Sequence, residues 1–270
     1  MTEASESNPA PQRTRPGPPK WETEARERLK AKVRSMTRPL QGLLERDANE
    51  GDTRHFVTDF LCDALGYDKY EDLSTEYLVK GEFADYGLRI DKQLCAFVEV
   101  KRVATKLGPK HLRQVEAYAI NEGVDWGILT NGNDWQVYHL APRSERSPSN
   151  GPLVEVDLTL EVALLGDEPP ARKLDKLFYL SKAAMQKKKP LDELWKQQRA
   201  TSPRSIGQAI CSEVVIEALR KELWRRTGHR AEANELERVL VSAVLRPEAL
   251  DQESALPPAS ARRRGLRSTP

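Results

Sequence analysis

The spacing of hydrophobic residues changes along the chain, and it predicts helices before and after a central group of strands. Pairs of apolar residues recur every four positions from Phe56 to Leu65, which predicts an amphipathic helix with Asp52 as its N-cap and Gly66 at its end. Residues 21–45 are charged with sparse apolar positions, and we expect an earlier helix there. Both segments precede the part of the chain in which the period changes to two.

Short apolar and alternating segments predict six strands in the middle of the chain. The expected strands are 74–80, 84–90, 94–101, 126–130, 135–140 and 153–158. We expect a helix over residues 109–121, and Asn131-Gly132 predicts a tight turn because both residues tolerate positive φ angles. Beyond residue 160, apolar residues at helical spacing, as in 206–218 and 236–244, predict helices again. The fold class is therefore α/β, with a mixed central sheet flanked by helices and a C-terminal helical extension.

Composition divides the chain into a central part and two margins. Residues 1–20 are polar and rich in proline and are expected to form a disordered arm. Residues 249–270 are expected to form a disordered basic tail. Between them we expect a domain of residues 21–160 followed by a helical extension of residues 161–248, which together are long enough to bury a core.

Hydropathy and cysteine content exclude several classes of protein. The mean hydropathy of -0.65 excludes an integral membrane protein. The three cysteines are scattered and form no Cys-x-x-Cys pair, which argues against a disulfide scaffold and against a cysteine zinc site. The first residues contain no apolar segment of the kind that a signal peptide needs. We therefore expect a cytoplasmic protein that does not associate with membranes.

The net charge of +2 hides an uneven distribution of charged residues. Residues 71–99 hold seven acidic and three basic side chains, whereas residues 182–199 hold six basic and two acidic ones. Four more arginines lie between residues 262 and 267. An acidic centre between basic segments suits a metal site that faces a polyanion. Solvated helix faces and a basic tail would give the same pattern, so charge alone does not decide between these interpretations.

The candidate chemistry lies on the second and third expected strands. Residues i and i+2 of a strand share a face, so Glu99 and Lys101 point the same way. If the hairpin is centred on Lys92, Asp85 lies opposite Glu99, with Cβ atoms roughly 4.5–5.5 Å apart. Two carboxylates this close repel each other unless a cation lies between them, and oxygen ligands with open water positions suit Mg²⁺ or Mn²⁺. A lysine on the same face can serve the attacking water and offset charge on a phosphate, which indicates phosphodiester hydrolysis.

An ordinary half-exposed hairpin would carry the same residues, because Glu-x-Lys is common by chance in charged proteins. The surroundings favour the catalytic interpretation. The third strand is very apolar, Asp85 stands at the matching register, and a helix follows the strand.

Several longer motifs carry a family resemblance. They are Ala84-Asp85-Tyr86, Phe97 to Arg102, Gln114 to Tyr118 and Trp126 to Gly132, with Asn49 to Arg54 and Ala64 to Asp68 upstream. Over roughly residues 45–145, the chain resembles the N-terminal nuclease domain of type I restriction endonuclease motor subunits. That domain is a member of the PD-(D/E)xK nuclease superfamily, in its RecB-like branch.

The resemblance implies a restriction-endonuclease-like sheet and a set of catalytic residues. Asp85 and Glu99 would bind the metal ion, which would be Mg²⁺ or Mn²⁺, and Lys101 would be the catalytic lysine. Glu50, on the first helix of the family, would be an additional acid of the catalytic site. The proline of the family's Pro-Asp motif is Ala84 in this sequence, which weakens the match at that position.

The resemblance also implies two substrate-binding residues. Gln114 and Tyr118 match the Q-x-x-x-Y motif, whose members lie beside the site and contact DNA. Their spacing of four supports this, because positions i and i+4 share a helix face. The alternative is a polar shoulder beside the apolar stripe of the same helix. His111 lies one turn earlier, and we expect it to be solvated.

The sequence predicts a metal-dependent DNA endonuclease that functions in restriction or defence. The chain has no G-x-x-x-x-G-K-[ST] phosphate loop, so we expect a stand-alone nuclease without the translocase. Its partner would be DNA, and a homodimer or separate motor and specificity subunits would complete the assembly. Two alternatives stay open: a catalytically inactive nuclease fold that binds nucleic acid or a protein, and an assembly protein built from the C-terminal helices.

Overall fold

The computed structural model describes residues 17–79, 82–146 and 152–249. Residues 1–16 of the expected arm and 250–270 of the expected tail lie outside the described residues. The helices are α1 (Lys20–Glu45), α2 (Glu50–Asp59), α3 (Pro109–Glu122), α4 (Pro170–Tyr179), α5 (Lys182–Lys188), α6 (Pro190–Ala200), α7 (Pro203–Ile210), α8 (Glu213–Thr227) and α9 (Ala233–Val239). The strands are β1 (Leu73–Val79), β2 (Glu82–Ile90), β3 (Gln93–Val100), β4 (Trp126–Thr130), β5 (Asp134–Arg146) and β6 (Pro152–Ala163). Short helical turns η1 (Phe60–Ala64), η2 (Leu240–Val244) and η3 (Pro247–Ala249) complete the described elements.

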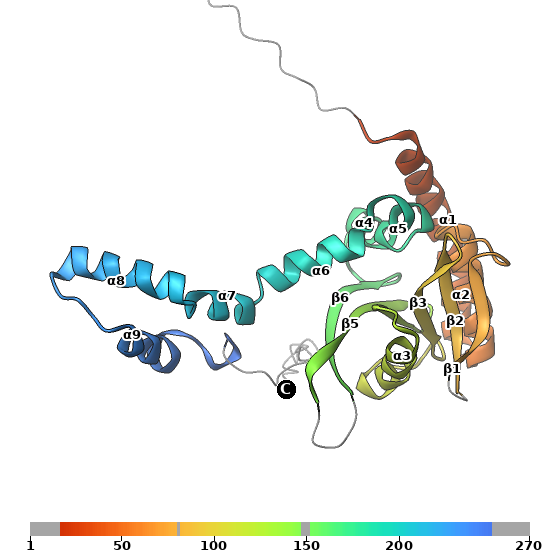
Figure 1. The fold of residues 1–270 in the computed structure, drawn as a ribbon. Coiled ribbons are helices and arrows are strands. Elements are labelled where there is room, and N and C mark those ends of the chain that lie inside the picture. Colours follow the sequence, from red (N-terminus) through yellow and green to blue (C-terminus); the bar gives the residue numbers. More distant parts are fainter. Residues whose placement is uncertain (1–16, 80–81, 147–151, 250–270) are drawn as a thin grey trace, which may run out of the picture.

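The strands form one sheet in the order β1-β2-β3-β4-β5-β6. Neighbouring strands are antiparallel except β3 and β4, which are parallel and are connected through α3. Parallel neighbours need such a crossover because a tight turn cannot join them. The predicted fold class is therefore confirmed: a mixed sheet is flanked by helices, and further helices follow it (Figure 1).

Apolar side chains pack on both faces of the sheet. The larger cluster joins side chains of α1, α2, α4 and α5 to the sheet, and the smaller cluster joins α3 to it. Alternation along β3 divides the two layers, since Ala96, Val98 and Val100 belong to the larger cluster and Phe97 to the smaller. The smaller cluster contains side chains of α3, which is the helix that follows β3 along the chain.

A glycine lets α3 lie close to β4. A Cβ atom at Gly127 would lie 2.3 Å from Cγ1 of Val115 and 3.1 Å from Cδ1 of Leu140. Real Cβ atoms do not approach that closely, so a side chain at this position would push α3 away from the sheet. Gly127 thereby fixes the height of α3 above the strands.

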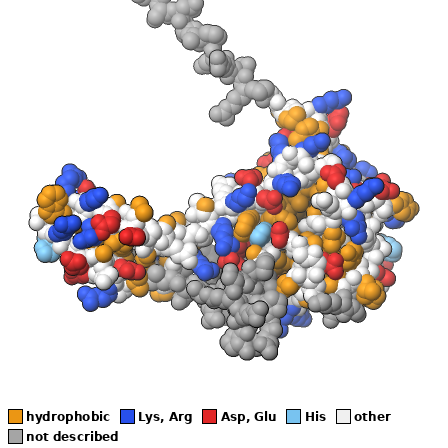
Figure 2. All heavy atoms as spheres, in the orientation of Figure 1, with side chains coloured by type: hydrophobic (Ala, Val, Ile, Leu, Met, Phe, Trp, Pro, Cys, Tyr) orange, Lys and Arg blue, Asp and Glu red, His pale blue; other side chains and the backbone are white. Residues whose placement is uncertain are grey.

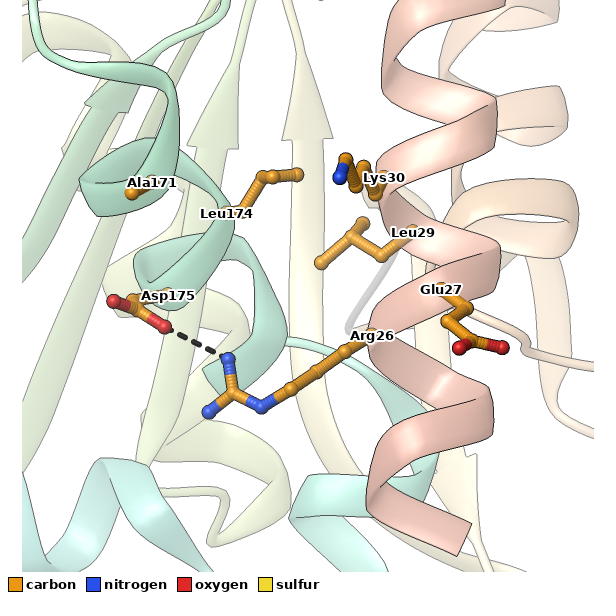
Figure 3. A pocket seen from close by; sticks show the side chains of 7 residues that line it. All are labelled: Arg26, Glu27, Leu29, Lys30, Ala171, Leu174 and Asp175. Atoms are coloured by element: carbon orange, nitrogen blue, oxygen red, sulfur yellow. Dashed lines mark hydrogen bonds and ion pairs between the residues drawn. The ribbon is translucent and has the colours of Figure 1, made fainter. Parts of the chain in front are cut away.

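The first helix packs against helices that come much later in the chain. Trp21 of α1 stacks on Phe178 of α4 with ring centroids 6.4 Å apart, and Arg26 donates to Asp175 at 2.7 Å. A cavity of about 240 Å³ lies between these two helices, bordered by Leu29 and Leu174 as well as by the Arg26–Asp175 pair (Figure 3). The N-terminal helix is therefore part of the same folded body as α4.

The last helices extend away from the sheet. Figure 1 shows α7, α8 and α9 as an arm that continues from α6. Large apolar side chains are exposed on this arm, including Val214 (80%), Trp224 (60%) and Val244 (62%), and hydrophobic side chains lie among charged ones at its surface in Figure 2. Among the described residues, no helix combines the length and the apolar content that crossing a bilayer requires.

Several predicted boundaries were wrong. The N-cap of α2 is Asn49, whose side chain accepts a hydrogen bond from the backbone N–H of Asp52 at 2.8 Å, so the helix begins earlier than predicted. Strand β6 reaches Ala163, beyond the predicted domain boundary at residue 160, because it pairs with most of the long strand β5. The predicted apolar stripe from Ile206 onward is divided between α7 and α8, and most of its side chains remain exposed.

The connection between β4 and β5 also differs from the prediction. Within it, Gly132 has a positive φ of 83°, whereas Asn131 does not. The side-chain Oδ1 of Asn131 instead accepts hydrogen bonds from the backbone N–H groups of Asn133 (3.0 Å) and Asp134 (2.6 Å). Asparagine therefore shapes this turn through its side chain rather than through a left-handed backbone.

Candidate functional site

The β2–β3 ladder brings two acidic positions next to each other. Tyr86 pairs with Val98, so the next positions along the antiparallel ladder are Asp85 and Glu99. Both side chains are buried, with 7% of Asp85 and 4% of Glu99 exposed. The predicted opposition of the two acids therefore agrees with the register of the ladder.

A two-residue turn and a bulge, which the sequence pattern did not predict, together set this register. The turn residues are Asp91 and Lys92, with φ angles of 51° and 68°, as in the two-residue turns that favour hairpins. A bulge between Leu88 and Arg89 then shifts the pairing by one residue. The shift compensates for the shorter turn, and beyond it the strands pair about Lys92 as predicted.

Asp85 is held by one backbone hydrogen bond and one ion pair. Its Oδ2 accepts the backbone N–H of Val100 at 2.7 Å, and its Oδ1 lies 2.6 Å from the Nη2 atom of Arg54. Burial raises the pKa of the Asp85 carboxyl, against the lowering effects of the Val100 hydrogen bond and of Arg54, and the charge of Glu50 raises it further. Even with the Arg54 guanidinium beside it, the Asp85 carboxylate is thus costly to ionise in this position.

Glu99 and Lys101 form an ion pair. The Nζ of Lys101 lies 2.6 Å from Oε1 of Glu99, as expected for side chains two residues apart at the end of a strand. The other oxygen, Oε2, is buried and has no hydrogen-bond partner among the described residues. Burial raises the pKa of Glu99, opposed by the hydrogen bond from Lys101, while the charges of Asp85 and Glu50 add to the increase. A buried acceptor without a donor is uncommon and indicates a missing partner.

Glu50 reaches the same site from another element. It is the first residue of α2, is partly buried, and follows the capping residue Asn49. Its charge acts on both Asp85 and Glu99, so the three acids lie within electrostatic range of one another. The cap that fixes the start of α2 therefore also places Glu50.

Arg54 is a member of this site that sequence reasoning missed. It lies on α2 between Glu50 and the helix end, and its guanidinium contacts Asp85 from 31 positions earlier in the chain. The available signal was its spacing of four from Glu50, which places both side chains on one face of α2. The sequence motif contained Arg54, but nothing in the pattern assigned it a partner.

The two predicted substrate-binding residues do not share an environment. Gln114 is exposed, whereas Tyr118 is buried, with 2% of its surface exposed, and packs in the smaller core cluster. The Tyr118 hydroxyl donates to the backbone carbonyl of Phe83 on β2 at 3.0 Å. Gln114 therefore remains available to a ligand, while the Tyr118 ring attaches α3 to the sheet.

His111 lies closer to the site than we expected. Its Nδ1 atom is buried and has no hydrogen-bond partner among the described residues. Burial lowers the pKa of His111, and the charges of Lys110 and Lys101 lower it further while Glu50 raises it. The first turn of α3 thus faces the region of Glu50 and Lys101.

The donor set fits a divalent cation that keeps part of its water shell. In the part of the chain that the structure describes, no three His, Cys, Asp or Glu side chains gather into a ready-made metal centre. Asp85 and Glu99 would therefore supply two oxygen ligands, and within residues 17–79, 82–146 and 152–249 Glu99 Oε2 has no other partner. Mg²⁺ is usually bound by one or two carboxylates together with waters and substrate phosphates, which matches such a sparse set.

The segment that contains these residues matches a family model. Residues 49–149 match the family described as type I restriction enzyme R protein N terminus. Searches of the curated proteins and of the solved structures gave no match to the chain. The matched segment begins at the N-cap of α2 and includes Glu50, Asp85, Glu99 and Lys101, whereas α4 to α9 lie beyond it. Residues 49–149 of this chain are thus similar to type I restriction enzyme R protein N-terminal domains.

Proposed function

We propose that this chain is a DNA endonuclease that hydrolyses phosphodiester bonds with the help of Mg²⁺ or Mn²⁺ and acts in restriction or defence. The observation that carries the proposal is the meeting of Asp85, Glu99 and Lys101 at one end of the β2–β3 ladder, inside the segment that matches the restriction family. The family supports a restriction-type nuclease role and DNA as the substrate. Metal dependence and the roles of these residues are our proposal.

Each residue has a distinct task in the proposed reaction. When bound, the divalent ion would neutralise charge on the scissile phosphate and activate water. Asp85 and Glu99 would hold the ion through their carboxylate oxygens. Lys101, whose side chain is 14% exposed, donates hydrogen bonds to the attacking water and offsets the charge that develops on the phosphate. Glu50 adds negative potential, and the exposed Gln114 contacts DNA.

The proposal is tested by cleavage assays on plasmid, linear duplex and single-stranded DNA with Mg²⁺, with Mn²⁺ and with EDTA. We expect cleavage only with a divalent ion and a loss of at least about 100-fold in Lys101→Ala, as for the removal of a group that acts on the proton transfer or the developing charge. Lys30→Ala is the matched control, because it removes the same charge from the exposed surface of α1. No cleavage by the parent under any condition, or equal cleavage by Lys101→Ala, contradicts the proposal.

Binding of nucleic acid without cleavage is the second candidate function. It is favoured by the pairing of both buried acids with cations of the chain itself, Asp85 with Arg54 and Glu99 with Lys101. Each of the two buried acids thus has a cation of the chain beside it without a metal. DNA binding that weakens with salt but is indifferent to Mg²⁺ and to Asp85→Asn would favour this alternative.

Double-strand cleavage usually needs two catalytic sites, whereas the described residues of one chain provide one. We therefore propose that the chain acts as a homodimer or together with separate motor and specificity subunits. Sedimentation of the protein with and without duplex DNA tests the first arrangement. A monomer that makes only single-strand nicks would exclude the homodimer and favour the assembly with separate motor and specificity subunits.

A further inference from the structure

The guanidinium of Arg54 lies between two carboxylates that belong to neighbouring strands. Its Nη2 atom is 2.6 Å from Oδ1 of Asp85, and its Nη1 atom is 3.5 Å from Oε1 of Glu76. The two contacts differ in length, since the first is a close ion pair and the second is a looser one. Arg54 is thus bound to Asp85 and already close to a second acid.

Glu76 occupies an unusual position in β1. The β1–β2 ladder pairs Thr75 with Tyr86 and Tyr77 with Ala84, which leaves Glu76 as the residue opposite Asp85. Its φ angle is 50°, in the left-handed region that residues other than glycine rarely adopt. The strained backbone occurs where the strand passes Asp85, and strain of this kind persists only where the surroundings enforce it.

The backbone of Arg54 is anchored by two hydroxyl groups, whereas its side chain is only partly satisfied. The backbone carbonyl of Arg54 accepts hydrogen bonds from the Tyr86 hydroxyl at 2.9 Å and from the Thr58 hydroxyl at 2.9 Å. Its Nε atom is buried and has no hydrogen-bond partner among the described residues. The present arrangement therefore leaves one donor of the guanidinium unsatisfied, and 34% of the side chain is exposed.

The site carries more negative than positive side chains. Four carboxylates face two basic groups, which leaves a net charge of −2 when all of them are ionised. These groups are Glu50, Glu76, Asp85, Glu99, Arg54 and Lys101. One divalent cation would neutralise the set, provided that Asp85 can release the guanidinium that now occupies its Oδ1 oxygen.

From this geometry, we propose that Arg54 is a positioning residue that exchanges partners: it holds Asp85 when no divalent cation is bound, and it transfers to Glu76 when Asp85 binds the cation. The inference deepens the proposed function and rests on it, since it assumes that Asp85 is a metal ligand. Arg54 then keeps the free site from repelling itself, and Glu76 lowers the cost of removing Arg54 from Asp85. No covalent step is involved, only the exchange of one ion pair for another.

Calorimetric titration of the full chain with Mn²⁺, without DNA, tests the exchange. Arg54→Met should bind Mn²⁺ about tenfold more tightly than the parent, since the ion no longer displaces a guanidinium, and tenfold corresponds to about 1.4 kcal/mol. Glu76→Gln should bind Mn²⁺ about threefold more weakly, within the range that an exposed ion pair contributes. Lys32→Met is the control, because it removes a cation from an ion pair with Asp63 between α1 and η1.

The double variant separates an exchange of partners from a simple effect of charge. If Glu76 receives Arg54, Glu76→Gln should have almost no effect on Mn²⁺ affinity when Arg54 is already Met. Equal effects of Glu76→Gln in both backgrounds would show that the charges act only through their field, which overturns the inference. Weaker Mn²⁺ binding by Arg54→Met would overturn it as well. Should Arg54→Met fold poorly, Arg54→Lys and Glu76→Gln supply the same comparison, with a smaller gain expected for Arg54→Lys.

The same Mn²⁺ titrations distinguish the exchange of partners from the proposed metal site. A parent that binds no Mn²⁺ contradicts the metal site itself and, with it, both proposals. A parent that binds Mn²⁺, loses binding in Asp85→Asn and shows no coupling between Arg54 and Glu76 retains the proposed function and loses only the exchange.

Discussion

At the scale of single residues, the two buried acids of the site are stabilised in different ways. Asp85 has both oxygens occupied, by a backbone N–H and by Arg54, whereas Glu99 has one oxygen on Lys101 and one without a partner among the described residues. Burial is the first cause of the raised pKa of each carboxyl. A cation that reaches both acids would remove the cost that burial imposes on their charges.

Asp85→Asn tests this cost. In EDTA we expect the variant to melt no lower than the parent, because it removes a buried charge that the fold disfavours. On addition of Mn²⁺ at about 100 times the dissociation constant, the parent should gain about 2.7 kcal/mol of unfolding free energy and the variant none. Thermal denaturation followed by circular dichroism measures both, and an equal gain by the two proteins would exclude Asp85 as a ligand.

A second pair of substitutions separates the roles of the two motif residues on α3. Tyr118→Phe should lower the unfolding free energy by about 1 kcal/mol, because it removes the hydrogen bond to the Phe83 carbonyl. Gln114→Ala, at an exposed position, should change stability by less than about 0.5 kcal/mol and should weaken DNA binding. Denaturant titration and fluorescence anisotropy with labelled DNA give the two readouts. Unchanged DNA affinity in Gln114→Ala would remove it from the substrate contacts.

At the scale of elements, close packing decides where α3 and α6 lie. Gly127 admits Val115 of α3, and the ring of Trp195 on α6 stacks on His139 of β5 at 3.7 Å. The indole of Trp195 also donates to Asp157 of β6 at 2.8 Å. These contacts attach α3 to β4, and α6 to β5 and β6. They depend on residues that lie far apart in the sequence.

Gly127→Ala should lower the unfolding free energy by about 1–3 kcal/mol, since the added methyl group overlaps the stiff β-branched side chain of Val115. Gly42→Ala is a control of opposite sign. Gly42 lies in α1, and beyond the backbone of its own helix an added Cβ would have no described atom within 4 Å, so alanine should stabilise the helix by about 0.4–1 kcal/mol. Urea denaturation of both variants checks the prediction, and equal stability of Gly127→Ala and the parent would show that α3 is free to move outward.

The His139 contact should make the attachment of α6 depend on pH. Burial lowers the pKa of His139 below its ordinary value of 6.5, although Asp125, Asp157 and Asp192 oppose the shift. The neutral ring is therefore favoured in the folded state, so its contribution to stability is complete above pH 6.5 and is lost as the pH falls from this value through the lowered pKa of the folded state. His139→Phe keeps an aromatic partner for Trp195 and should lose less stability than the parent between pH 7.5 and pH 5.5. Tryptophan fluorescence during denaturation at the two pH values measures the difference.

At the scale of the whole molecule, a sheet body carries the candidate site and a helical arm leaves it. Helices α7, α8 and α9 pack mainly against one another and against η2 and η3, while Arg204 of α7 reaches Glu155 of β6 at 3.3 Å. The family match ends before the arm begins. The arm also exposes large apolar side chains such as Trp224, which is typical of a surface that meets another molecule.

A chain that ends at Thr201, the C-cap of α6, should keep the unfolding free energy of the sheet body within about 1 kcal/mol, because few contacts cross to the arm. If the arm mediates assembly, the shortened chain should sediment as a monomer under conditions in which the full chain associates. Sedimentation velocity and thermal melts measure the two effects. A large loss of stability would show that the arm belongs to the folded body.

The sequence by itself determined the features that depend on local periodicity. The alternation along residues 84–90 and 94–101 predicted the hairpin, and a spacing of two predicted that Glu99 and Lys101 meet, because a strand repeats every two residues. Tertiary structure alone decided which groups approach from elsewhere. The pairing of Arg54 with Asp85 depends on how α2 packs on the sheet, and the burial of Tyr118 depends on the height of α3 above β4. Period and spacing are properties of one segment, whereas the partner of a buried charge is set by the packing of two.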